Sequence, residues 1–527
     1  MIRFRALGAL RLEAAATPTA DAAGAALRSA RFITSFYLKS LCMPIKRHAV
    51  HVRNLHTRCI VAALLASALF SCQSGPDSVK NPGEVMSRSG LGREQYFDAI
   101  AAARQRGVDA ASETALRRMI SADGYAIDAR VQAFDLLQET HPKSVVEALE
   151  NSLPRMGDVA WRERVCAMIG EAKIEALVPT LIRAWANPAT GFVMKDERPE
   201  RAAIAKIVGE DQVSATLLRT MREASPITAA NLRARCWELL MKSGDSARLR
   251  ALLADADSVR GDLMLTDLAR CAVELGVLPT TREEVLWARE LCKPQHAAFF
   301  AAAREALAVM PQERRESIEI RSLPIAVAAK ERRPNLLIEP EQVLYDEIAA
   351  RIADRRKSSP DFTGFGAGFT ENLYEQRHRA HWSDLAAMVM ALDVLSEEAL
   401  LRHLFEQADR DLEDRTTELG GVVAVDESGH GELLEFAPRT KSGDLRYESP
   451  QALFNALYTG LFHYHNHTQK YENSAYAGPH TGDFAFADST RCNGLVFTFL
   501  STDLIGVDFY RYDRFVVDLG AVARPEN

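Results

Sequence analysis

The sequence is poor in cysteine, which excludes the fold classes that depend on it. Of the eight cysteines in 527 residues, three lie in residues 1–72, and the others are Cys166, Cys236, Cys271, Cys292 and Cys492. None of these five forms a Cys-x-x-Cys pair, so the sequence predicts neither a disulfide framework nor a cysteine-ligated zinc site. Cys166, Cys236 and Cys271 occupy apolar helical positions, where a thiol acts as a small core side chain.

A surplus of positive charge is also missing. Ten of the 64 basic and two of the 71 acidic residues lie in residues 1–72. The remainder therefore holds 54 basic and 69 acidic residues, a net charge of −15. Proteins that bind nucleic acid do so with a basic surface. The acidic remainder argues against nucleic acid as a partner.

The apolar run at residues 59–70 is too short to span a bilayer. It follows a basic stretch that begins at Met43, and it leads into Leu69-Phe70-Ser71-Cys72. A basic segment, a short apolar segment and a small residue before the cut are typical of a secretory signal. With cysteine after the cut, residues 43–72 resemble a bacterial lipoprotein signal, in which Cys72 would carry the lipid. The resemblance implies a membrane-anchored lipoprotein of the bacterial cell envelope, on the outer-membrane or periplasmic face.

The segments on either side of this signal have no fold of their own in our prediction. Residues 1–42 precede a complete signal, so we expect an over-extended start; the alternative is an Arg-rich, acid-poor organellar transit segment. Residues 73–92 are rich in Ser, Pro, Gly and Asn, which predicts a flexible tether.

A repeat of 34 to 37 residues follows the tether. Helical segments led by arginine recur at steps of 34, 37, 34, 35 and 34 residues, beginning at Arg130, Arg164, Arg201, Arg235, Arg270 and Arg304. Periods of this size predict an all-α solenoid, here over residues 93–311. Residues 161–187 resemble HEAT-type repeats, with Gly170 and Gly209 expected to close helices. The resemblance implies a concave surface that binds a protein; the alternatives are a rigid spacer or a platform for packing.

Residues 312–395 are predicted to be a linker with helices. Three prolines interrupt the chain before a charged amphipathic helix at 341–356, and a further helix is expected at 382–395. The Gly-rich segment 360–368 lacks the Lys-Ser/Thr pair of a phosphate-binding loop, so we interpret it as a linker.

The C-terminal part alternates short helices and strands. A helix is expected at 396–414 with Ser396 as its N-cap, another at 450–458 after Ser449, and a third capped by Thr481. Strands are expected at 422–425, 432–437, 461–467, 495–500, 505–510 and 515–517. This order predicts a small α+β domain that follows the solenoid.

Four polar residues in this domain have the chemistry of a hydrolytic metal site: Glu418, His465, His467 and Asp483. Histidines two positions apart on a strand point to the same side. A catalytic zinc takes three such ligands and leaves a position for water. A carboxylate outside the ligand set can then accept the proton of that water.

Residues 396–521 resemble the JAMM (MPN-type) metallopeptidases. In that family a glutamate lies beside a glycine-containing strand. A His-x-His strand follows, and then a Ser-x-x-Asp sequence that opens a helix. In this sequence Glu418 stands 47 residues before His465. The resemblance implies that His465, His467 and Asp483 hold zinc and that Glu418 is the general base. His480 stands where the family has serine and could donate to an oxyanion. Residues 471–475 look like an insertion, expected at the substrate rim.

A simpler interpretation remains open for each of these residues. The histidines could form a polar strand face, the helix dipole alone favours Asp483 in a first turn, and Glu418 could be a surface carboxylate.

The sequence leaves two functions open. The first is a lipid-anchored zinc peptidase or isopeptidase whose solenoid recruits a protein. The alternative is a non-enzymatic scaffold lipoprotein with a JAMM-like domain.

Overall fold

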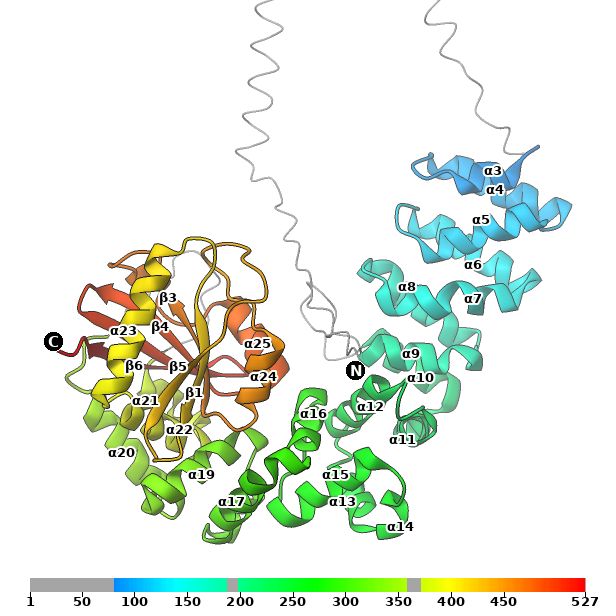
Figure 1. The fold of residues 1–527 in the computed structure, drawn as a ribbon. Helices are drawn as coiled ribbons and strands as arrows, with labels where there is room; N and C mark the ends of the chain where they lie inside the picture. The colour runs from blue at the N-terminus through cyan, green and yellow to red at the C-terminus, as the bar shows by residue number, and fades with distance from the viewer. Residues whose placement is uncertain (1–79, 187–197, 358–370, 527) are drawn as a thin grey trace, which may run out of the picture. The chain divides into compact units, whose positions relative to one another are not determined.

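Helices dominate the described residues between 80 and 395, and a six-stranded sheet follows (Figure 1). The computed structural model describes residues 80–186, 198–357 and 371–526, and the chain divides into two compact units, residues 1–213 and 214–527. The predicted order, a helical region and then a small α+β domain, is confirmed. The predicted signal at 43–72, its Cys72 and the Gly-rich segment 360–368 lie outside the described residues.

The first unit is built from short helices that pack on their neighbours in the chain. They are α3 (Pro82–Ser87), α4 (Arg93–Arg106), α5 (Ala110–Ser121), α6 (Ile127–Thr140), α7 (Pro142–Ser152), α8 (Val159–Glu171), α9 (Val178–Ala186) and α10 (Pro199–Val208). Each contacts the helices one or two places away, as α5 contacts α3, α6 and α7.

Helix α3 corrects the prediction of a flexible tether over residues 73–92. Pro82 stands at the start of the helix, where its fixed φ suits the first turn. Val85 and Met86 are buried, and a Cβ on Gly83 would come within 2.8 Å of the backbone of Ala111 in α5. Two apolar side chains are therefore enough to attach this polar segment to the helical core. Within the described residues, the packed structure begins at α3 rather than at residue 93.

Buried arginines pair with carboxylates at or within later helices, and of the three described here Arg130 alone belongs to the arginine repeat of the sequence. Arg130 pairs with Asp158 at 2.9 Å, and Arg162 pairs with Glu200, which is fully buried. In the second unit Arg233 pairs with Asp262 in the same manner. The arginines two positions later in the predicted frame, Arg164 among them, are not buried. The recurring chemical element is thus an arginine that binds a carboxylate of a later helix.

Gly170 does not close a helix as the repeat pattern predicted. It lies inside α8, where a Cβ would approach Cα of Ala203 to 3.1 Å, so its role is the close approach of α8 to α10. Gly209 does end α10, with a φ of 96° that glycine adopts without strain.

The second unit begins with further helices. They are α11 (Val213–Glu223, whose first residue ends the first unit), α12 (Ala230–Lys242), α13 (Ser246–Ala254), α14 (Ala256–Val259), α15 (Leu263–Arg270), α16 (Arg282–Leu291), α17 (Ala297–Ala308), α18 (Gln312–Glu316), α19 (Leu323–Arg332), α20 (Glu341–Ile352), α21 (Leu373–Gln376) and α22 (Trp382–Val394). Trp287 of α16 donates from Nε1 to the carbonyl of Tyr458, which follows α24 (Gln451–Leu457). No helix in the described ranges is both long and apolar enough to cross a membrane.

Residues 312–357 and 371–395, predicted to be a linker with helices, are packed structure. Asp384 at the start of α22 is fully buried between two arginines, Arg321 at 2.9 Å and Arg511 at 2.8 Å. Arg321 also donates to the side chain of Asn493 at 2.6 Å. Arg511 belongs to the sheet, so this buried ion cluster attaches the helices of 320–395 to it.

The sheet has the order β2-β1-β3-β4-β5-β6. Its strands are β1 (Gly420–Val425), β2 (Gly431–Glu435), β3 (Phe462–His467), β4 (Gly494–Ser501), β5 (Leu504–Arg511) and β6 (Phe515–Ala523). Strands β3 and β4 pair in parallel and the other neighbours are antiparallel. The crossover from β3 to β4 contains α25 (Thr481–Thr490).

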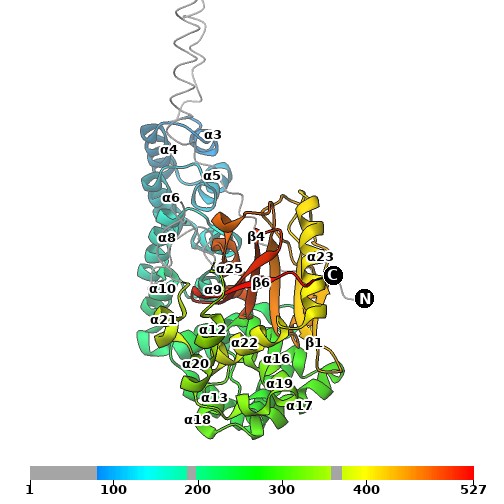
Figure 2. The same ribbon diagram turned by 90° about the vertical axis from the view of Figure 1, so that its left-hand side faces the viewer.

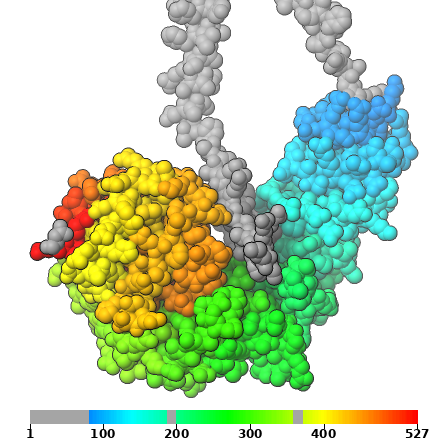
Figure 3. Space-filling model, viewed as in Figure 1, coloured from blue at the N-terminus to red at the C-terminus, as the bar shows by residue number. Residues whose placement is uncertain are grey.

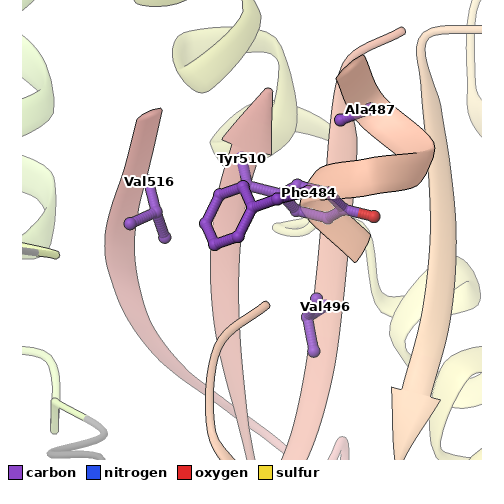
Figure 4. Packing of buried hydrophobic residues seen from close by; sticks show 5 residues of the cluster. All are labelled: Phe484, Ala487, Val496, Tyr510 and Val516. Carbon is purple, nitrogen blue, oxygen red and sulfur yellow. The ribbon is translucent and has the colours of Figure 1, made fainter. Parts of the chain in front are cut away.

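Helices cover both faces of the sheet. Figures 1 and 2 show α23 (Glu398–Glu413) and α25 on opposite sides of it. Beneath α25, Phe484 and Ala487 pack on Val496, Tyr510 and Val516 of β4, β5 and β6 (Figure 4). The outer side of α23 forms part of the surface (yellow in Figure 3).

Three predicted helix caps differ from those observed. The N-cap of α24 is Pro450, not Ser449. Ser396 donates its hydroxyl to the carbonyl of Asp393, and Glu397 is the N-cap of α23. His480, not Thr481, is the N-cap of α25, and Asp483 accepts from the backbone N–H of His480 at 2.7 Å. This reciprocal arrangement orients the Asp483 carboxylate in the first turn.

Candidate metal centre

The predicted site residues meet on one face of the sheet. His463, His465 and His467 alternate along β3 on the side covered by α25, and all three are buried. β1 pairs with β3 so that Gly420 lies opposite His465, which brings the segment containing Glu418 beside the histidines. The three elements that hold these side chains are therefore β3, the start of β1 and the first turn of α25.

The glycine pair after Glu418 is required by this packing. A Cβ on Gly420 would lie 2.5 Å from the carbonyl oxygen of Tyr464, and a Cβ on Gly421 would lie 2.1 Å from that of Leu434. Both distances are below those of real contacts, so the Glu-Leu-Gly-Gly sequence allows β1 to approach its neighbours closely.

Donor atoms of four residues converge. Nε2 of His465 lies 3.2 Å from Nε2 of His467 and 3.3 Å from Oδ1 of Asp483. Oε1 of Glu418 lies 3.9 Å from Nε2 of His467. Ligands bonded at about 2.0–2.1 Å to a tetrahedral zinc are about 3.3 Å from one another. The two distances from Nε2 of His465 match this value. Two groups have donor atoms that all lie within 4.8 Å of one another and could bind a metal: Glu418, His465 and His467, and His467, His480 and Asp483.

The tautomer of His467 leaves its Nε2 lone pair available. Nδ1 lies 2.7 Å from the backbone carbonyl of Tyr476, which can only accept a hydrogen bond, so Nδ1 carries the proton. A ring fixed through its other nitrogen is the usual arrangement of a metal-binding histidine.

Charge within the cluster is balanced by one proton on His465. Burial lowers the pKa of His465, but the carboxylates of Asp483 and Glu418 outweigh burial and raise this pKa to about 9. Burial lowers the pKa of His467 to about 3, so that ring stays neutral. Burial opposes charge on Asp483 too, but His465 outweighs it and lowers the pKa of that carboxyl. A bound cation would take the place of the His465 proton.

Glu418 lies slightly apart from the other donors. Burial raises the pKa of Glu418 to about 8, and Asp483 and Asp411 add to the rise while His465 opposes it. Nε2 of Gln469 donates to Oε1 of Glu418 at 3.1 Å and to the carbonyl of Asp444 at 2.8 Å. A carboxyl group with a pKa near neutrality can both accept and return a proton.

His480 stands beside the site, as its place in the sequence predicted. Its ring stacks on that of His467, with centroids 5.1 Å apart, and it is partly exposed. His467, His480 and Asp483 also have one donor atom each within 4.8 Å of one another. His480 is therefore close enough to act as a hydrogen-bond donor or as an alternative ligand.

The segment that resembled an insertion is part of the support of the site. Asn473 is fully buried, and its amide donates to the carbonyl of His467 at 3.0 Å and to the side chain of Gln469 at 2.6 Å. Residues 471–475 were expected at the substrate rim, and Asn473 of this segment in addition holds the backbone of a site histidine.

Sequence reasoning missed three supporting residues: Asp411, Gln469 and Asn473. Asp411 accepts from the Leu419 backbone N–H at 2.7 Å and from the Thr468 hydroxyl at 2.6 Å, which ties the chain after Glu418 to the chain after His467. Asp411 lies near the end of the predicted helix 396–414, and no motif marks it. Gln469 lies two residues after His467, and this proximity was the available signal.

Comparison with known proteins adds no relative. No known protein family, no curated protein and no solved structure matches this chain.

Proposed function

We propose that residues 396–521 form a zinc-dependent peptidase or isopeptidase domain of the JAMM type. The observation that supports the proposal is the spacing of His465, His467 and Asp483, whose donors lie 3.2 and 3.3 Å apart, with Glu418 within 3.9 Å. These three residues would hold the zinc. When bound, the ion would polarise a carbonyl group and lower the pKa of a water molecule.

Glu418 would be the general base. Its carboxylate accepts a proton from the water that attacks a peptide or isopeptide carbonyl, and it passes this proton to the departing amine. The hydrogen bond from Gln469 holds its Oε1 in place. His480, which is partly exposed, would donate a ring N–H to the oxygen that gains charge during the attack.

The helical region would recruit the substrate. We propose that its neighbour-to-neighbour packing is that of a HEAT-like solenoid, with a concave face that binds a protein.

A lipid on Cys72 would hold the protein on the bacterial envelope. Labelling with a fatty-acid analogue tests the anchor: the label should appear on the wild type and be absent from Cys72→Ser, and an unlabelled wild type would refute it.

Metal analysis of the purified full-length protein tests the proposed site. The wild type should bind about one zinc per chain and His465→Ala none, because two remaining ligands hold zinc poorly. His430→Ala is the matched control, since His430 is an exposed histidine of the same domain. Hydrolysis of a peptide library should follow the zinc content. A stable protein that binds no metal would instead support the non-enzymatic scaffold.

A further inference from the structure

Two cysteines that are 21 positions apart in the sequence lie side by side in the second unit. Cys271 opens the π-helical turn Cys271–Leu275 that continues α15, and Cys292 is the C-cap of α16. Their Sγ atoms are 3.7 Å apart. Cys271 is buried, whereas Cys292 is partly exposed. They form no Cys-x-x-Cys motif, so their proximity was not predicted from the sequence.

We propose that Cys271 and Cys292 are a dithiol that closes reversibly to a disulfide and so links α15 to α16. A disulfide bond is about 2.05 Å long, so each sulfur must move by about 1 Å to close the gap. The other described cysteines, Cys166, Cys236 and Cys492, are all buried and lie in other elements.

The two thiols have different roles in this reaction. The contact with Cys271 lowers the pKa of Cys292, while the same contact and burial raise the pKa of Cys271. Cys292 is therefore both the more reachable and the more acidic thiol, and the thiolate is the nucleophile in thiol–disulfide exchange.

The oxidant is an external disulfide, and the exchange balances in two steps. The Cys292 thiolate attacks one sulfur of the external disulfide, forms a mixed disulfide and releases the first external thiolate. Cys271 loses its proton to that thiolate and attacks Sγ of Cys292, which releases the second external thiolate. Two protein thiols are oxidised and one external disulfide is reduced to two thiols. An external dithiol reverses both steps.

Closure would restrict the part of the helical region that contacts the α+β domain. The disulfide encloses α16, whose Trp287 donates to the carbonyl of Tyr458 at 2.9 Å. A link of this kind stabilises the folded state mainly by limiting the unfolded chain, with a larger effect for longer loops.

The test uses the full-length protein and oxidised glutathione as the probe. After equilibration, alkylation under denaturing conditions and digestion, we expect a peptide that joins positions 271 and 292 and two fewer alkylated thiols. The thermal midpoint of the oxidised form should be a few degrees above that of the reduced form. Complete alkylation of both cysteines, or a link to any other cysteine, would overturn the proposal.

Single variants check the order of the two steps. Cys271→Ser should stop at a mixed disulfide of glutathione with Cys292, and Cys292→Ser should leave Cys271 unmodified because that thiol is buried. Cys236→Ser is the control and should form the 271–292 link as the wild type does. If Cys271→Ser does not fold, Cys271→Ala replaces it, and a Cys292 that resists glutathione in a folded variant contradicts the assigned roles.

Discussion

Glu418 lies close enough to the histidines to be either a metal ligand or a base. Its Oε1 is 3.9 Å from His467, longer than the 3.2 and 3.3 Å that separate the other donors. Its hydrogen bond from Gln469 occupies the same oxygen. The proposed role of Glu418 is that of the base, and a Glu418→Gln variant tests it.

Glu418→Gln should therefore retain zinc and lose about 10²- to 10⁴-fold in turnover, which is the usual contribution of a positioned general base. His467→Ala should lose zinc and turnover together. Metal content and kcat measured on the same preparations distinguish the outcomes. Loss of zinc in Glu418→Gln would instead make Glu418 a ligand.

The addition of one methyl group at Gly420 should have a large effect on stability and on zinc binding. A Cβ there would lie 2.5 Å from the Tyr464 carbonyl, so Gly420→Ala should cost about 1–3 kcal/mol of unfolding free energy and reduce zinc binding. Gly482→Ala is the control, because nothing lies within 4 Å of the added Cβ. Denaturant unfolding of both variants checks this, and equal stability would show that β1 can move away from β3.

At the scale of helices, the buried ion pairs should contribute more to the free energy of unfolding than the exposed arginines of the sequence repeat do. Arg162→Ala leaves the fully buried Glu200 without its closest partner and should cost about 3–5 kcal/mol. Arg164→Ala, two residues later on the exposed side of α8, should change stability by less than about 0.5 kcal/mol. Thermal unfolding followed by circular dichroism compares them; similar losses would contradict the observed frame.

The sequence predicted most helices and strands of the α+β domain but not the long-range contacts that hold them in place. Strands near 422–425 and 461–467 and the helix at 396–414 are close to the observed β1, β3 and α23, because local alternation and periodicity mark them. Long-range contacts carry no such local mark. The pairing of Asn473 with the backbone of His467, and of Arg321 with Asp384, depends on how distant segments fold together.

Across the whole second unit, a group of buried carboxyl groups should make stability depend on pH. Burial, then Asp518, raises the pKa of Glu371 to about 8, and burial with Asp518 and Glu371 raises that of Asp508 well above its usual range. A carboxyl group whose pKa is higher in the folded than in the unfolded protein binds its proton more tightly in the folded state. Its contribution to stability is fully present below the unfolded-state pKa near 4.5, and it is lost as the pH rises through about 8.

Asp508→Asn should therefore raise the thermal midpoint at pH 8 by a few degrees and flatten its fall between pH 5 and about pH 8. Asp503→Asn, at an exposed turn before the same strand, should follow the wild type. Calorimetry over this pH range gives both curves. A wild-type midpoint that rises with pH would contradict the prediction.

The ion cluster of Arg321, Asp384 and Arg511 also defines which piece of this protein is portable. A fragment cut at residue 396 would leave Arg511 without the carboxylate of Asp384 and would remove α22, which carries it. The smallest segment that can be grafted onto another protein, or expressed by itself, therefore begins before Ile320 and not at the start of the JAMM-like resemblance. A segment meant to fold by itself should follow the compact unit, which begins at Ser214.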